Sequence, residues 1–270
     1  MIEFYPIADS VYLSLIQSDG QLGLGVYRTM VSTSAFWNAM NISVLYSMTS
    51  TFFAVAIGLA LTFILGQNLR GRNVFEAFFV FPLAAAPIVV GVLWSPAEMW
   101  DDIQTFLHFI LHLPYFNELT PAFFFPVMTY AEAWEWAPLI MLVCLSIVNS
   151  TPKAIYEAAD VCGASAWQKF RTITVPMIMR SPVMQFVVVL RFIDAMRAFE
   201  IPLTWSSWVG YSATVGAPVD SLSLYLYKLL FIPTFGFPVN LVSAMAVTLF
   251  GVTLVGAAIM FRLTKTIGGS

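Results

Sequence analysis

Hydrophobic residues gather in five long segments of this chain that carry few or no charges. A helix that crosses a bilayer needs about 20 mostly apolar residues, so segments of this length predict membrane-spanning helices. We expect five complete spans, near residues 44–65, 77–97, 126–148, 182–199 and 239–261. The pattern therefore predicts an all-α fold, a polytopic transmembrane helical bundle.

The N-terminal stretch differs from these segments. FYPIADSVYLSLI, residues 4–16, is apolar, but Pro6 and Asp9 interrupt it and it is too short to cross a bilayer. It also lacks the basic start and small-residue cleavage site of a signal peptide. We expect the outer end of a partial first helix or an interfacial segment in residues 1–40, followed by one membrane domain in residues 41–266.

Composition supports the bilayer as the solvent of this chain. Hydrophobic residues make up 59% of it and charged residues only 10%, whereas a soluble domain has about a quarter charged residues. A chain with fifteen acidic and twelve basic side chains and no basic run is not expected to bind nucleic acid.

Basic residues gather in alternate loops. Eight of the twelve lie between the first two spans, between the third and fourth, or after the last. They are Arg70, Arg72, Lys153, Lys169, Arg171, Arg180, Arg262 and Lys265. The opposite loops hold Glu98, Asp101, Asp102, Glu118, Asp220 and Lys228. Cytoplasmic loops carry an excess of Lys and Arg, so we expect the basic loops and the C-terminus to face the cytoplasm.

The loop at residues 150–180 has clear helix signals. Thr151-Pro152 predicts a helix start with proline at the first helical position. A short helix should then run over residues 153–161 and stop at Gly163. Ser165 and Gln168 are spaced as a capping box that opens a second helix. We expect this helix–turn–helix to expose Tyr156, Glu157, Asp160, Trp167 and Phe170, an unusual site for large aromatic side chains unless a partner covers them.

This loop resembles the EAA loop of ABC-importer permeases. In that family Glu-Ala-Ala is followed after three residues by Gly, and after nine more by Ile-x-Leu-Pro. Here the matching positions are Glu157-Ala158-Ala159, Gly163 and Ile173-Thr174-Val175-Pro176. Only Val175 departs, replacing leucine.

The resemblance implies a type I ABC importer permease fold with a six-span core, in the bacterial inner membrane. By resemblance, the first loop helix docks on an ATP-binding subunit through Glu157, Ala158, Ala159, Asp160 and Gly163, with Ile173 and Pro176 completing the motif. The implied partners are two ATP-binding subunits, an external solute-binding protein, and a second permease, which is a distinct homologous chain or a copy of this one. ATP and Mg²⁺ would be bound by those subunits and no cofactor by this chain, which has no Walker pattern.

Other segments resemble the maltose-type carbohydrate-uptake subgroup of these permeases. They cover roughly residues 36–205 and read FWNAMNISVLYS, FPLAAAPIVVGVLW, AEAWEWAPLIMLVCLSIVNSTPKAIYEAA and VVVLRFIDAMRAFEIPLTW. After the last of these, the Thr-x-Gly-Gly-Pro usual in the subgroup is absent. The resemblance implies import of a sugar or polyol, with glycerol or glycerol phosphate as the alternative.

Charged side chains within the predicted spans are costly and suggest function. Arg191, Asp194 and Arg197 follow one another at steps of three, so they share a helix face. They predict either an ion-pair ladder, within the helix or to the second permease, or a solute path lined by Arg191 or Asp194.

Acidic and aromatic residues alternate in the outer half of the third span. Glu132 and Glu135 offer carboxylates for solute hydroxyls, and Trp134 and Trp136 offer faces for sugar stacking. The competing interpretation is an interfacial aromatic belt with acids reaching the headgroups.

Several further features allow two interpretations each. Pro82 and Pro87 interrupt the second span, as a packing kink or beside a transport site. The segment 206–223 is either an external gate loop or a connector. His108 and His112 have the spacing of a metal pair but no third ligand nearby, which favours a surface or interfacial helix.

Two other classes of protein are less consistent with the sequence. A secondary transporter usually has more spans and detectable repeats. A membrane enzyme needs a catalytic constellation, and Glu132 and Glu135 are the only candidates, three residues apart.

Overall fold

The computed structural model describes residues 4–17, 20–67, 72–95, 98–115, 120–232 and 239–268. These residues are helical apart from connecting turns and one antiparallel bridge between Ile16 and Leu22. In chain order the helices are α1 Phe4–Leu15, α2 Gly25–Ser32, α3 Ser34–Leu65, α4 Arg72–Val80, η1 Phe81–Ala84, α5 Pro87–Leu93, α6 Met99–Leu111, α7 Pro121–Asn149, α8 Lys153–Val161, α9 Ala166–Lys169, η2 Phe170–Thr174, α10 Val175–Arg180, α11 Pro182–Met196, α12 Glu200–Trp208, α13 Leu222–Phe231 and α14 Val239–Gly268.

Three helices, α3, α7 and α14, are long and apolar enough to cross a membrane unbroken. Two further candidates are bent pairs: α4 and η1 meet α5 at 101°, and the α9–α10 segment meets the α11–α12 segment at 71°. The five predicted spans are therefore present if each bent pair counts as one span. The second is not a continuous helix, because Pro82 and Pro87 cannot donate backbone hydrogen bonds.

Small residues hold α3 against α7. Ala54 and Gly58 of α3 face Ala133, Ala137 and Ile140 of α7, and these alanines and Ile140 are fully buried or nearly so. A methyl group added to Gly58 would lie 2.6 Å from Cγ2 of Ile140. The absence of a side chain there lets the two helices approach closely.

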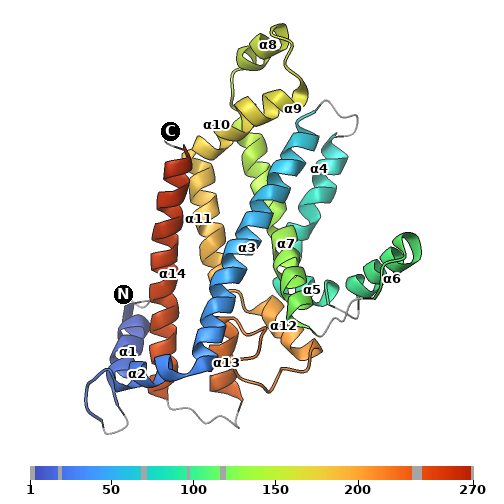
Figure 1. Cartoon of the computed structure of the whole chain (residues 1–270). Helices are drawn as coiled ribbons and strands as arrows, with labels where there is room; N and C mark the ends of the chain where they lie inside the picture. Colours follow the sequence, from blue (N-terminus) through green and yellow to red (C-terminus); the bar gives the residue numbers. More distant parts are fainter. Residues whose placement is uncertain are drawn as a thin grey trace.

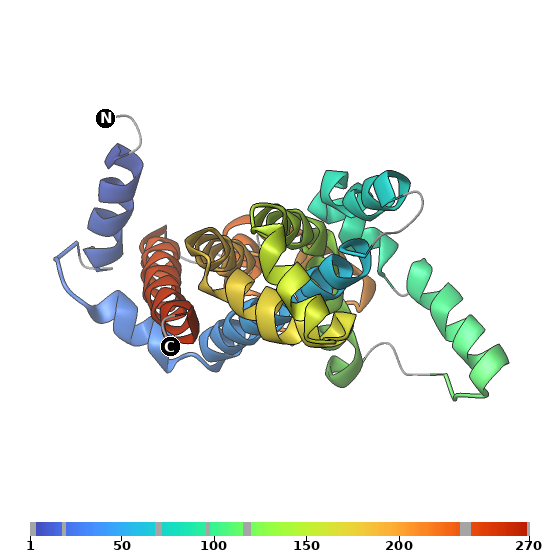
Figure 2. The same cartoon turned by 90° about the horizontal axis from the view of Figure 1, so that it is seen from above.

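Figure 1 shows α3, α7, α11 and α14 side by side along the length of the bundle. The helices α8 and α9 and the C-terminal end of α14 lie at one end. The helices α1, α2, α12 and α13 lie at the other, where Asn240 at the start of α14 donates a hydrogen bond to the carbonyl of Ile16, 2.8 Å. Seen from the α8 end, α8 and α9 lie over the bundle while α6 projects to one side (Figure 2).

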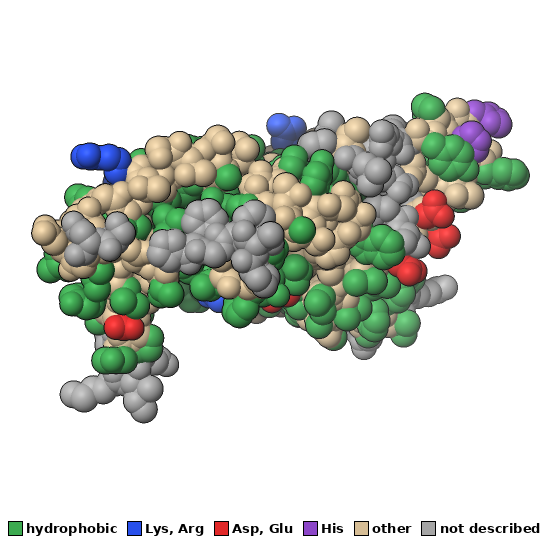
Figure 3. All heavy atoms as spheres, turned by 90° about the horizontal axis from the view of Figure 1, so that it is seen from below, with side chains coloured by type: hydrophobic (Ala, Val, Ile, Leu, Met, Phe, Trp, Pro, Cys, Tyr) green, Lys and Arg blue, Asp and Glu red, His purple; other side chains and the backbone are tan. Residues whose placement is uncertain are grey.

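The surface of the bundle is apolar. Val255 of α14 is 61% exposed, and Leu254, Ile259 and Phe186 are more than half exposed. In water such a surface would be unfavourable, whereas lipid tails solvate it. The view from the end opposite α8 shows hydrophobic side chains over much of the molecule and few charges (Figure 3).

Candidate functional site

The loop helix α8 stands beyond the end of the bundle (Figure 1). It begins at Lys153 and ends at Val161, as the sequence predicts. Pro152 is the residue before the helix rather than its first residue, a shift of one position from the prediction. After the helix, Gly163 adopts a left-handed backbone with φ +76°, and a methyl group added there would meet no atom within 4 Å. Glycine is therefore required here for conformation and not for space.

The motif residues form the outward side of this turn. Glu157, Ala158, Asp160 and Gly163 are exposed, and Ala159 is half-buried. Ile173 and Pro176 are half-buried and line a groove with Thr151 and Ile155. The structure thus brings the motif residues together at one projecting end, with the glutamate and one alanine free to meet another surface.

The second half of the loop ties α8 to the bundle. Ser165 and Gln168 form the predicted capping box. Trp167 and Phe170 stack on each other and both meet Phe63 of α3, with ring centroids 5.4 and 4.9 Å from it. The Tyr156 hydroxyl lies 3.1 Å from Thr174 Oγ1.

The expectation that Tyr156 and Phe170 are exposed is therefore wrong. Both are half-buried because they pack on the chain's own helices, whereas Trp167 remains 57% exposed. Asp160 is exposed as expected and forms an ion pair with Lys169.

Arg191 is the centre of a buried polar cluster within the bundle. Its side chain is fully buried, and Nη2 donates to Glu132 Oε1 at 2.7 Å and to Ser50 Oγ at 3.2 Å. Its guanidinium carbon also lies 5.0 Å from the ring centroid of Trp136. Three helices, α3, α7 and α11, supply these groups, so the cluster fixes them against one another.

Asp194 and Arg197 contribute less to this cluster than the ladder interpretation predicts. Arg191 reaches Asp194 at 3.4 Å, and the Asp194 side chain is 48% exposed. Within the described residues Arg197 has no ion pair. The principal partner of Arg191 is Glu132, which is distant in the sequence.

A polar cavity of about 310 Å³ adjoins the cluster. Its lining includes Glu132 and Glu135 from α7, Asp194 from α11, Glu200 from α12, and Pro87 at the break of the second span. The predicted pathway residues Glu132, Glu135 and Asp194 therefore share one cavity, next to a discontinuous helix. Trp136 also lines it, whereas Trp134 packs edge-on against Trp94, 5.7 Å between centroids.

Glu135 has an unusual environment in this cavity. Glu135 is only 6% exposed. Within the described part of the chain, no hydrogen bond or ion pair to its carboxylate is found. Buried carboxylates are normally paired. Glu132 and Glu135 therefore differ: the first is bonded to the protein, and the second is available to a ligand.

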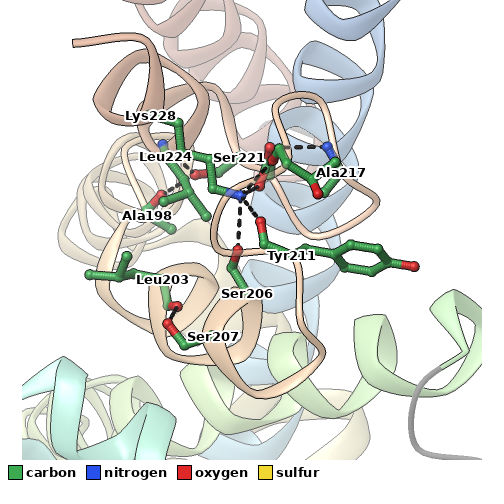
Figure 4. Close-up of polar contacts among 11 residues, drawn as sticks. Ala198, Leu203, Ser206, Ser207, Tyr211, Ala217, Ser221, Leu224 and Lys228 are labelled. Carbon is green, nitrogen blue, oxygen red and sulfur yellow. Dashed lines mark hydrogen bonds and ion pairs between the residues drawn. The ribbon is translucent and has the colours of Figure 1, made fainter. Parts of the chain in front are cut away.

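A second buried ion pair lies at the end opposite α8 (Figure 4). Lys228 Nζ of α13 donates to Asp220 Oδ1 at 2.6 Å, to Ser206 Oγ at 2.8 Å and to the Tyr211 and Thr214 carbonyls. Burial raises the pKa of the Asp220 carboxyl, against the opposing effect of Lys228. Asp220 lies in the loop between α12 and α13, as the sequence predicts, whereas Lys228 lies in α13. Both side chains are buried, so the expectation of two exposed loop charges is wrong.

No metal site is found within the described ranges: no group of three His, Cys, Asp or Glu residues could hold an ion there. His108 stacks on Tyr115 and His112 ends α6 in a left-handed conformation. Both histidines lie on the projecting helix (purple in Figure 3). Arg70 and Glu118, which entered the loop-charge argument, lie outside the described residues, as does the side chain of Arg72.

Comparisons with known proteins agree with the predicted family and fold. Residues 21–268 match the family described as binding-protein-dependent transport system inner membrane component. The trehalose/maltose transport system permease protein MalF of Thermococcus litoralis is 31% identical over 182 residues, which are 67% of this chain and 61% of that protein. The trehalose transport system permease protein SugA of Mycobacterium tuberculosis is 28% identical and covers 96% of this chain and 82% of its own.

The fold is shared with a solved transporter. In the crystal structure of a bacterial ABC transporter involved in the import of the acidic polysaccharide alginate, one chain matches with a TM-score of 0.78 and 19% identity, over 96% of this chain and 89% of that one. The resemblance predicted from the EAA loop and the spans is thus confirmed. The family match covers most of the chain, and the protein is a member of the binding-protein-dependent transport system inner membrane component family, the permeases of ABC importers.

Proposed function

We propose that this chain is a permease subunit of an ABC importer and forms half of the translocation pathway for a sugar or polyol. A distinct homologous permease would supply the other half, two ATP-binding subunits the energy, and an external binding protein the solute. The observation that carries this proposal is α8, a short helix held beyond the bundle with Glu157 and Ala158 exposed.

The geometry of the loop supports a role in force transmission. Docking on another subunit would cover Glu157 and Ala158, which the bundle leaves exposed. Movement of α8 would reach α3 through Phe63 and its contacts with Trp167 and Phe170, and η2 through the contact of Tyr156 with Thr174. ATP and Mg²⁺ would act on the partner subunits, so this chain would move solute without bond-making chemistry of its own.

The distribution of basic residues indicates how the chain is oriented in the membrane. Lys153, Lys169, Arg171 and Arg180 lie in or beside the α8 end, and Lys265 follows in the last turn of α14. Because positive residues accumulate on the cytoplasmic side, we place α8 and the C-terminus in the cytoplasm and α12 and α13 on the outer side of the inner membrane.

The coupling test uses the complete transporter in proteoliposomes, with ATP hydrolysis and solute uptake measured together. Glu157→Ala and Gly163→Ala should each lower the solute moved per ATP at least fivefold while the assembled complex remains intact. Cys162→Ala, an exposed position on the same loop, is the matched control. Normal coupled uptake by both loop variants would refute the proposal.

Contact between α8 and an ATP-binding subunit is tested separately. Ala158→Cys in a Cys162→Ser background should crosslink to an ATP-binding subunit in native membranes, and a cysteine at exposed Val255 on α14 should not. If Ala158→Cys forms no crosslink to an ATP-binding subunit, that subunit does not dock on α8.

The solute class draws support from relatives and from the polar cavity. The names of MalF and SugA, and of the lactose transport system permease LacF of Rhizobium radiobacter, 25% identical, refer to sugars. UgpA of Rhizobium meliloti, named for sn-glycerol-3-phosphate, is 23% identical, which keeps glycerol phosphate as the alternative. Thermal shift of the cognate binding protein with sugars, glycerol and glycerol phosphate distinguishes them.

A further inference from the structure

The carboxylates around the polar cavity outnumber its cations. Glu132, Glu135, Asp194 and Glu200 line it, and Arg197 is the one basic residue among its lining groups. Arg191 lies behind this lining. Four carboxyl groups thus face two guanidinium groups, so acidic groups predominate around the cavity.

The buried arginine is not available to an anionic ligand. Arg191 is fully buried and is not among the residues that line the cavity. Its Nη1 and Nη2 atoms already contact Glu132, Ser50 and Asp194, and its Nε has no partner among the described residues. Its contact with the ring of Trp136 also covers part of that ring. Among the residues that the structure describes, Arg197 is thus the only cation in the cavity lining, together with Asp194 and Glu200.

Glu135 adds an unpaired negative group to this surface. Glu135 lies in the cavity lining and is only 6% exposed. It has no hydrogen-bond or ion-pair partner among the described residues. A buried carboxylate with free lone pairs accepts hydrogen bonds from hydroxyl or ammonium donors and repels phosphate or carboxylate groups.

We infer that this cavity is a selectivity site for charge: it admits uncharged, hydroxyl-bearing solutes and cations and excludes anions, with Glu135 as the discriminating residue. The inference rests on the proposed function and deepens it, since it favours a neutral sugar or polyol over glycerol phosphate. At an effective dielectric constant of about 20, a unit charge about 6 Å from a singly charged solute changes the partition of that solute into the cavity by on the order of 100-fold.

The test measures the charge of the cavity without knowledge of the solute. Ala198 lines the cavity and is half-buried. In the complete transporter with Cys144 and Cys162 replaced by serine, Ala198→Cys is labelled with two thiol reagents, a trimethylammonium and a sulfonate methanethiosulfonate. Ser212→Cys, exposed on the loop outside the cavity, calibrates the intrinsic ratio of the two rates.

We expect the cation-to-anion ratio at Ala198→Cys to exceed that at Ser212→Cys at least tenfold, and Glu135→Gln to lower it at least threefold. Asp101→Asn, an exposed acid on α6, should leave it unchanged. Phe199→Cys replaces Ala198→Cys if the latter does not assemble. Equal ratios at the two sites, no effect of Glu135→Gln, or no labelling by either reagent would each overturn the inference.

The outcome is separable from that of the coupling test. If labelling is asymmetric but ATP hydrolysis drives no uptake, the proposed function fails and the cavity charge stands. If uptake is coupled but labelling is symmetric, the selectivity site fails alone.

Discussion

Glu132 should be the partner on which the stability of the Arg191 cluster depends. Glu132→Gln preserves size and removes the charge that lies 2.7 Å from the fully buried guanidinium. The remaining contacts are Ser50 and Asp194, and Asp194 is 3.4 Å away and 48% exposed. Removing one member of a buried pair leaves an uncompensated charge and costs about 3–5 kcal/mol.

The prediction distinguishes the two partners of one arginine. Asp194→Asn breaks a longer, half-exposed contact, and such pairs are worth about 0–1 kcal/mol. With roughly 2–4 °C per kcal/mol in a chain of this size, Glu132→Gln should lower the midpoint of thermal unfolding by roughly 10 °C and Asp194→Asn by less than about 3 °C.

The assay is thermal unfolding of the detergent-solubilised protein, followed by tryptophan fluorescence. Glu132→Gln combined with Arg191→Met removes both buried charges, so the double variant should be more stable than Glu132→Gln alone. If Asp194→Asn proves the more destabilising change, or if the double variant recovers nothing, the assignment of Glu132 as principal partner is refuted.

Three further predictions concern the packing of α3 on α7, the buried Lys228–Asp220 pair and the aromatic contacts of Phe63. Gly58→Val should cost about 1–3 kcal/mol by crowding Ile140, seen as a lower unfolding midpoint. Lys228→Met should leave Asp220 buried without its cation and speed proteolysis of residues 209–221. Phe63→Ala removes two ring contacts, each worth about 0.5–1.5 kcal/mol, and should reduce uptake per ATP without loss of assembly.

Controls decide each of these results. Gly251→Ala, where an added methyl group meets no atom within 4 Å, should leave the midpoint unchanged; an equal loss in both glycine variants argues against close packing. Adding Asp220→Asn to Lys228→Met should slow proteolysis again. Full coupling in Phe63→Ala would show that the aromatic contacts do not transmit movement.

Local signals predicted local structure well. The bounds of α8, the turn at Gly163 and the Ser165 capping box each depend on residues within a few positions of one another, and all three agree with the structure. The proline break of the second span was also evident, because a missing N–H acts where the proline stands. Its 101° angle was not, since it depends on how η1 and α5 pack on other helices.

Contacts between residues far apart in the sequence could not be predicted from the sequence. Arg191 and Glu132 are 59 positions apart, whereas Arg191 and Asp194 have helical spacing, so the sequence favoured the weaker pair. Lys228 was assigned to a loop because it lies between two predicted spans. Only the folded chain shows that Ser206 and two carbonyls surround its ammonium group.

The close contact of Gly58 with Ile140 limits how this protein could change shape. Because a side chain at Gly58 would clash with Ile140, the packing of α3 on α7 depends on the absence of a side chain there, and so closely packed a pair resists sliding of one helix along the other. The bent helix pairs turn elsewhere, at Ala85–Ala86 and at Ser181, where the backbone is extended and no helical hydrogen bonds need to break for the angle to change.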